Sequence, residues 1–140
     1  MKNVSLGRGF LVLALGLALA GCKIEVRVPP GGSVMSADGS FNCMAGQTCV
    51  VNVVDFFFDQ TYVAMAAQNH YFAGWEDKEG YLCAGEDGYC TVSTTAFTGN
   101  DAVLAFIESD ETLVLKPKFV FSPMPHVPEL VISPDPGQSD

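Results

Sequence analysis

The chain has 140 residues, of which 49% are hydrophobic and 16% charged, and its formal net charge at pH 7 is −9. This length suits one ordinary domain and excludes a multidomain enzyme. The acidic balance repels phosphate backbones and argues against a nucleic-acid partner, while the apolar content excludes a wholly disordered protein.

The N-terminus is typical of an export signal. Lys2 and Arg8 precede an unbroken apolar run from Phe10 to Ala20. This run is shorter than the about 20 residues that a membrane-crossing helix needs. A short apolar run after a basic start instead predicts a secretory signal.

The end of this run carries the four residues Leu19-Ala20-Gly21-Cys22, which resemble the lipobox of bacterial lipoprotein signal peptides. The resemblance implies a signal peptide over residues 1–21, cleavage before Cys22, a diacylglyceryl group on its thiol and a fatty acyl chain such as palmitate on its new amino group. The membrane would then be a partner of the chain through this anchor. The alternative is a buried free Cys22 after an ordinary signal peptide.

Lys23 directly follows the expected lipid-bearing cysteine. In lipoproteins of double-membraned bacteria, a residue other than Asp at this position accompanies transfer to the outer membrane, so the resemblance implies that location. Cleavage would leave five basic and 16 acidic residues, a formal charge of −11. Such a charge disfavours anionic lipid, so the acyl chains must supply the anchoring.

The segment 22–121 predicts a mainly β, small antiparallel domain, with an α+β arrangement as the alternative. Alternating or continuous apolar residues indicate strands over 24–28, 33–36, 49–58, 61–67, 71–75, 89–95 and 113–121. Asp38-Gly39 predicts a hairpin turn after the second of these. The Ala and Met content of 63–68 is also compatible with a helical turn.

Four cysteines remain after Cys22, and an even number in an exported chain predicts disulfides. Three pairings are possible. Cys43–Cys49 and Cys83–Cys90 are favoured because each closes a short loop rich in turn residues at a hairpin tip. A four-cysteine zinc site is the alternative, but neither spacing is the one usual for zinc knuckles.

Later elements include the predicted core anchor Trp75, at the end of an aromatic strand between two turns. Apolar residues at helical spacing over 101–107, behind Asn100 or Asp101 as N-cap, predict one short helix.

Pro117 lacks a backbone donor, so the last strand should lie at an edge or bulge there. Five prolines over 122–140 predict a disordered tail.

Phe56-Phe57-Phe58 lies within a predicted strand, where successive rings point to opposite faces. We expect a central strand that is buried on both faces, because a domain this small has few other large side chains for its core. An exposed aromatic patch for a partner or glycan is the alternative.

Several of these segments, in this order, resemble the divergent B-repeat of internalin-type bacterial surface proteins. The resemblance covers about residues 24–121 and is carried by Gly31-Gly32-Ser33-Val34, the two cysteine pairs, the segment 58–67, Tyr71-Phe72-Ala73-Gly74-Trp75 and the segment 113–119. It departs from the family at Asp59-Gln60, where the repeat has Gly, and at the longer connection 95–111. The resemblance implies a β-grasp-like unit used for display, spacing or binding rather than catalysis.

The chain offers few candidates for chemistry. His70 and His126 are its two histidines, and no Gly-X-Ser-X-Gly motif occurs. Acidic turns at 76–79 and 86–87 lack the spacing of a calcium loop, so we interpret them as solvated turns. We therefore expect no catalytic residue, metal or cofactor. The sequence predicts a non-enzymatic envelope lipoprotein that meets an envelope protein or glycan, with a lipid-anchored binder of a glycan or metal ion as the alternative.

Overall fold

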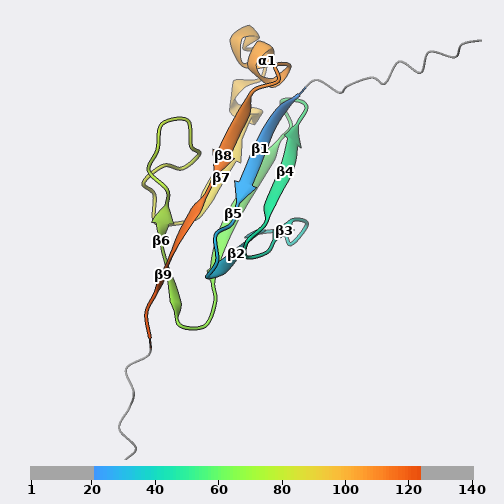
Figure 1. Cartoon of the computed structure of the whole chain (residues 1–140). Helices are drawn as coiled ribbons and strands as arrows, with labels where there is room; N and C mark the ends of the chain where they lie inside the picture. The colour runs from blue at the N-terminus through green and yellow to red at the C-terminus, as the bar shows by residue number, and fades with distance from the viewer. Residues whose placement is uncertain (1–20, 124–140) are drawn as a thin grey trace, which may run out of the picture.

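The computed structural model describes residues 21–123 (Figure 1). The predicted signal peptide over 1–21 and the Pro-rich tail over 122–140 thus lie almost entirely outside the described residues. The elements are, in chain order, β1 (Cys22–Arg27), β2 (Gly32–Ser36), β3 (Asn42–Cys43), β4 (Thr48–Val53), β5 (Asp59–Ala66), β6 (His70–Trp75), β7 (Cys90–Ser93), the 3-10 helix η1 (Thr95–Phe97), α1 (Asp101–Ile107), β8 (Thr112–Leu115) and β9 (Pro117–Phe121).

The strands form three small sheets with the orders β4-β1-β8, β3-β2-β5-β7 and β6-β9. All pairs are antiparallel except β1 and β8, which run parallel. The prediction of a mainly β domain with antiparallel sheets and one short α-helix is therefore confirmed. In Figure 1, α1 lies at one end of the elongated domain, whereas β6 begins and β9 ends at the opposite end.

Strand β1 is the centre of its sheet and alternates as its sequence predicts. Cys22, Ile24 and Val26 are buried, whereas Glu25 and Arg27 point outward and form an ion pair of 2.6 Å. The strand has β4 on one side and β8 on the other, so its apolar face lies in the middle of the core.

The predicted hairpin at Asp38-Gly39 is present between β2 and β3, where Val34 pairs with Cys43. Asp38 accepts hydrogen bonds from the backbone N–H and the hydroxyl of Ser40, at 3.1 and 2.8 Å. The Ser36 hydroxyl, and then the backbone N–H and the hydroxyl of Ser40, lower the pKa of Asp38 to about 2, because hydrogen bonds to the carboxylate favour its charged form. Local side-chain bonds thus fix this turn.

Two predicted strands change their bounds. The strand expected over 49–58 ends at Val53, and residues 54–58 form a turn before β5. The residues that are compatible with a helix, 63–68, instead belong largely to β5, which pairs with β2 and β7. Residues 63–66 pair with β2, and residues 59–62 of the same strand pair with β7, so this tertiary pairing overrides the helical preference of Ala and Met.

Trp75 is fully buried and is held by the loop that follows it. Its backbone N–H donates to Glu86 O at 2.7 Å, and its indole Nε1 donates to Gly88 O at 2.9 Å. Gly74 makes this approach possible, because it has φ +94° and a Cβ there would lie 2.9 Å from Glu86 O. The ring of Phe72 packs edge-on against the indole at 5.3 Å between centroids.

The two predicted disulfides are confirmed. Cys43 is bonded to Cys49 across the β3–β4 connection, and Cys83 to Cys90 around the loop that carries Glu86 and Gly88. Cys43 and Cys90 are fully buried, so each bridge ties a surface loop to the core.

The predicted helix is also confirmed, with Asn100 as its N-cap. The Asn100 side chain accepts hydrogen bonds from the backbone N–H groups of Ala102 and Val103, at 3.1 and 3.2 Å. Ile107 is buried in the core and Val103 packs against it, one turn apart. Helix α1 therefore covers the end of the domain with one narrow face.

The last predicted strand is divided at Lys116. β8 joins the sheet of β1, and β9 begins at the buried Pro117 and pairs with β6. The register between β6 and β9 shifts between Phe72 and Trp75, where Trp75 is opposite Pro117. This irregularity is the bulge that the missing backbone donor of Pro117 predicts.

We expect Trp75→Ala to lower the free energy of unfolding by about 3–5 kcal/mol, as deletion of a large buried ring does. Urea titration followed by far-ultraviolet circular dichroism measures this loss without relying on tryptophan emission. Tyr71→Ala is the matched control, because Tyr71 is exposed in the same strand. A Trp75→Ala protein as stable as the Tyr71→Ala protein would contradict the structure.

Peptide mapping without reductant should recover Cys43 linked to Cys49 and Cys83 linked to Cys90. Replacing either pair by alanines should reduce the free energy of unfolding by about 2.5 kcal/mol, the loop-closure value for rings of seven or eight residues. A peptide linking Cys43 to Cys83 would show that the strand order is wrong.

Tyr62 leads to a prediction about pH. It is fully buried, its hydroxyl has no hydrogen-bond partner among residues 21–123, and burial raises its pKa to about 12. Between pH 10 and 12 the unfolded chain loses this proton while the folded chain keeps it, so stability falls as pH rises, by up to about 1.4 kcal/mol per unit. At pH 7, the free energy of unfolding of Tyr62→Phe should equal or exceed that of the parent. In urea titrations from pH 10 to 12, it should fall by less than that of the parent.

Candidate functional site

The expected lipidation residue, Cys22, is the first residue of β1. It is 2% exposed and belongs to the core cluster. It is opposite Val53 of β4, and the next backbone N–H, of Lys23, donates to Glu111 O at 2.9 Å. Cys22 is the free cysteine of the described chain. Burial, and then the nearby Glu111 carboxylate, raise the pKa of its thiol, which makes the uncatalysed thiol unreactive.

This position is incompatible with a diacylglyceryl group, because there is no room for acyl chains in the packed core around the Cys22 sulfur. A lipidated Cys22 must therefore leave this place at the end of β1. Only the first residue of the strand has to move, since the pairing of Lys23 with Asn52 and Thr112 lies beyond it. Of the other lipobox residues, Leu19 and Ala20 lie outside the described residues, and Gly21 lies against Val53 and Val54.

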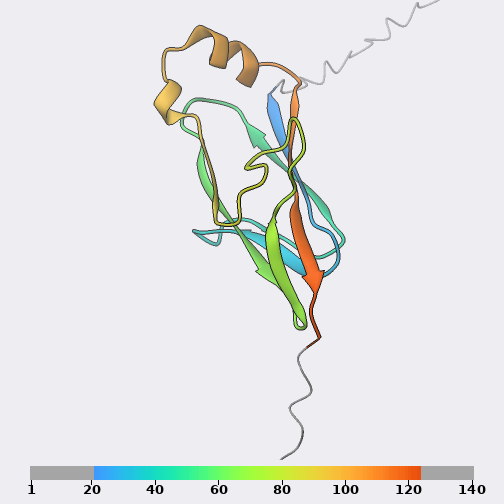
Figure 2. The ribbon, with the colours of Figure 1, turned by 90° about the vertical axis from the view of Figure 1, so that its left-hand side faces the viewer.

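Large apolar side chains are exposed on three segments at the end of the domain where β1 begins. Phe57 and Val54 come from the β4–β5 turn, Phe97 from η1, and Leu104 and Phe106 from α1. Figure 2 shows this turn, η1, α1 and the start of β1 at the same end of the molecule. We call these five residues the apolar end surface.

The expectation of a buried Phe56-Phe57-Phe58 strand is wrong for its central residue. Phe57 is 81% exposed, while Phe56 and Phe58 pack partly against the core. The three rings lie in a turn held by Asp55, whose carboxylate accepts from the Phe57 backbone N–H at 2.8 Å. A turn need not alternate its side chains between two faces, so Phe57 is free to point into solvent.

Of the apolar end surface, the sequence indicates only Phe57, as part of an exposed aromatic patch that is the alternative to a buried strand, although a further signal lies in the helix. The helix Asp101–Ile107 carries six apolar residues in seven positions, and a short helix lying on a core buries only one face. Some of its large side chains must therefore be exposed, and Leu104 and Phe106 are.

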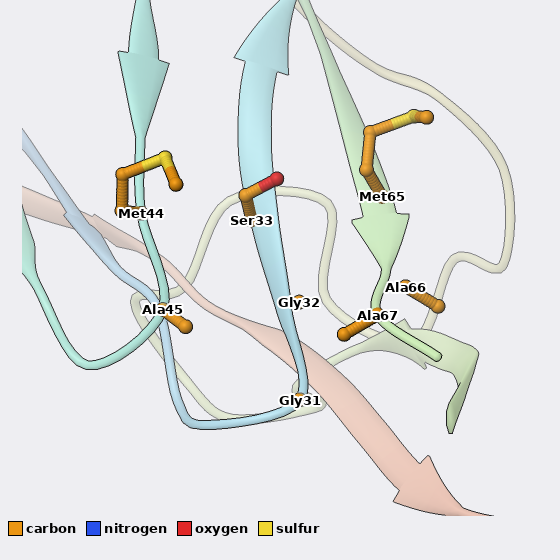
Figure 3. Close-up of a pocket in the computed structure, with 8 residues that line it drawn as sticks. All are labelled: Gly31, Gly32, Ser33, Met44, Ala45, Met65, Ala66 and Ala67. Carbon is orange, nitrogen blue, oxygen red and sulfur yellow. The ribbon is translucent and has the colours of Figure 1, made fainter. Parts of the chain in front are cut away.

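A shallow apolar depression lies beside β2 (Figure 3). It has a volume of about 250 Å³ and is lined by Gly31, Gly32, Ser33, Met44, Ala45, Met65, Ala66 and Ala67. Gly32 is required here, because a Cβ would lie 2.4 Å from the Phe119 ring and 2.5 Å from Met65 O. The lining offers one hydroxyl and no aromatic ring, so it has few groups with which to orient a polar ligand.

The titratable residues considered for chemistry are dispersed. The Nδ1 of His70 lies 3.0 Å from Gln68 O, its ring packs edge-on against Phe121, and His126 lies outside the described residues. In the acidic turn 76–79, Glu76 forms an ion pair of 2.6 Å with Lys116. Within residues 21–123, no three His, Cys, Asp or Glu side chains are grouped as a metal site would need.

Comparison with known proteins gives no relatives. No protein-family model matches the chain, and neither a curated protein nor a solved structure is detectably similar to it. In the part of the chain that the structure describes, no helix is long and apolar enough to cross a membrane.

Proposed function

We propose that this protein is a non-enzymatic lipoprotein of the bacterial cell envelope, which carries its acyl chains on Cys22 and displays a small disulfide-stapled domain as an interaction or spacer module. The observation that carries the proposal is the sequence Leu19-Ala20-Gly21-Cys22 after a short apolar run. Cys22, the proposed attachment point, is the first residue of β1.

The position of Cys22 supports this proposal in one respect and constrains it in another. Strand β1, of which Cys22 is the first residue, begins at the end of the domain with α1 (Figure 1), so acyl chains on Cys22 can extend away without crossing the core. The burial of Cys22 means that the thiol is accessible only while the first residue of β1 is not packed. Lipid attachment and packing of Cys22 are thus mutually exclusive states of the same side chain.

The interior and the surface favour an interaction or spacer role over ligand capture. The core is formed by side chains from all three sheets and α1. The depression beside β2 is shallow and almost entirely apolar, whereas a glycan site needs several converging polar groups or rings. The formal charge of −11 on residues 22–140 keeps such a domain soluble beside a membrane.

An outer-membrane location is part of the proposal and depends on Lys23. A residue other than Asp after the lipid-bearing cysteine is the feature that supports it. The partner would be an envelope protein or a glycan, and the module would meet it with the faces of the domain that point away from the membrane.

Growth with radiolabelled palmitate tests the anchor. The parent should incorporate label and fractionate with membranes, and Cys22→Ser should lose both properties because the thiol is the expected attachment point. A Cys22→Ser protein that still labels and still fractionates with membranes would overturn the proposal.

Lys23→Asp is the matched control for this labelling experiment. It keeps the cysteine and should label as the parent does, yet it should move from the outer to the inner membrane fraction. Unchanged fractionation of Lys23→Asp would contradict the outer-membrane location and leave the anchor itself intact. Circular dichroism of both variants checks that they fold.

A further inference from the structure

The apolar end surface and the chain entry lie side by side. Val54 directly follows Val53, the partner of Cys22 in the β1–β4 ladder. A Cβ on Gly21 would lie 3.7 Å from the Val54 side chain, so the chain enters the domain against this surface. The apolar run Phe10–Ala20 is joined to the domain at this same point.

Hydrogen bonds to backbone carbonyl groups connect the segments that carry this surface. The Thr94 hydroxyl donates to Asp55 O at 3.1 Å, and the Thr94 N–H donates to Phe58 O at 2.9 Å, which connects the β4–β5 turn to the segment before η1. On the other side, the bond from Lys23 N–H to Glu111 O connects β1 to the segment after α1. The backbone segments that carry the exposed side chains are therefore held together.

From these observations we propose that the apolar end surface lies in the interfacial region of the lipid bilayer to which Cys22 is anchored. The proposal rests on the proposed lipidation of Cys22 and adds an orientation to it. In this orientation, α1 and the β4–β5 turn contact the membrane. The start of β6 and the end of β9 point away from the membrane.

The main reason to propose a bilayer as the partner of the apolar end surface is that no spacer separates the lipid anchor from the folded domain. After cleavage before Cys22, the next residue is already hydrogen-bonded in the sheet, so no flexible segment separates the acyl chains from the domain. The anchor therefore holds the apolar end surface at the membrane at high effective concentration. Phe57, Phe97 and Phe106 are side chains that suit the boundary between headgroups and acyl chains.

Charge specifies the kind of bilayer. The acidic residues at this end are Asp55, Asp101, Glu108, Asp110 and Glu111, and Lys23 is the basic residue beside them. Carboxylates next to a negative surface are repelled. The surface therefore fits zwitterionic lipid better than anionic lipid.

The opposite end is a competing surface, because Tyr71 and Phe121 are exposed there. Tyr71 is the second residue of β6, which begins at the end farthest from α1 (Figure 1). The two ends differ in the position of the anchor, which lies at the end with α1. This difference provides a matched control.

The test uses the lipidated protein in vesicles of phosphatidylcholine with brominated acyl chains, which quench nearby tryptophan emission. Trp75 is the single native tryptophan and is fully buried, so it gives a constant background. Phe57→Trp adds a reporter on the apolar end surface, and Tyr71→Trp adds one at the opposite end. We expect the added emission of Phe57→Trp to fall by at least half relative to unbrominated vesicles, and that of Tyr71→Trp to stay unchanged.

Two further measurements sharpen the result. Replacing half of the lipid by phosphatidylglycerol should reduce the quenching of Phe57→Trp, and so should adding Leu104→Ser and Phe106→Ser to it. Far-ultraviolet circular dichroism shows whether each variant is folded, and the emission of Trp75 reports on its core.

The outcomes separate this proposal from the one on which it rests. Labelled, membrane-bound Phe57→Trp that is not quenched would overturn the proposed orientation while the lipoprotein assignment stands. Crosslinking between copies through this end, again without quenching, would assign the surface to a second copy and also overturn it. Loss of labelling in the parent would instead remove the lipid anchor itself.

Discussion

The packing of Trp75 against the loop 83–90 is the interaction on which the rest of the structure depends. The indole fills the core where β6, β9 and this loop meet, and the loop has no regular strand or helix to hold it in place over most of its length. Two hydrogen bonds from Trp75 and the Cys83–Cys90 disulfide hold it instead. Gly74 supplies the backbone conformation and the space that the contact requires. The residues of the aromatic-X-Gly-Trp segment therefore act together, because the contact of Trp75 with the loop requires Gly74 beside it.

This unit also connects the small β6-β9 sheet to the central sheet. The backbone N–H of Glu76, directly after Trp75, donates to Lys116 O at 2.8 Å, and the side chains of the two residues form an ion pair. Lys116 is the residue between β8 and β9, so the chain passes from one sheet to the other beside Trp75. Leu115 and Pro117, on either side of it, are both buried. The two sheets thus share one core although no ladder joins them.

Local signals in the sequence predicted local features well. Asn100 or Asp101 before an apolar run indicated the start of the helix, Asp38-Gly39 predicted the hairpin, and the short spacing of the cysteines favoured the observed pairing. Features that depend on distant segments were missed. The parallel pairing of β1 with β8 has no local signature, and the exposure of Phe57 depends on where β4 ends. The burial of Cys22, which the sequence left open as the alternative to a lipidated cysteine, depends on Val53 and on Glu111, neither of which is close to it in sequence.

In the proposed lipoprotein, the parallel pairing of β1 with β8 has a consequence for the order of events during export. Almost the whole domain separates these two strands in sequence, and contacts of such long range form late, because a long loop has to close first. A chain crossing a membrane from its N-terminus cannot complete its central sheet until β8 has also crossed. Throughout that period the first residue of β1 has only part of its final surroundings. In the proposed lipoprotein, the topology thus leaves the thiol of Cys22 accessible to a modifying enzyme during translocation and closes that opportunity once the last strands arrive.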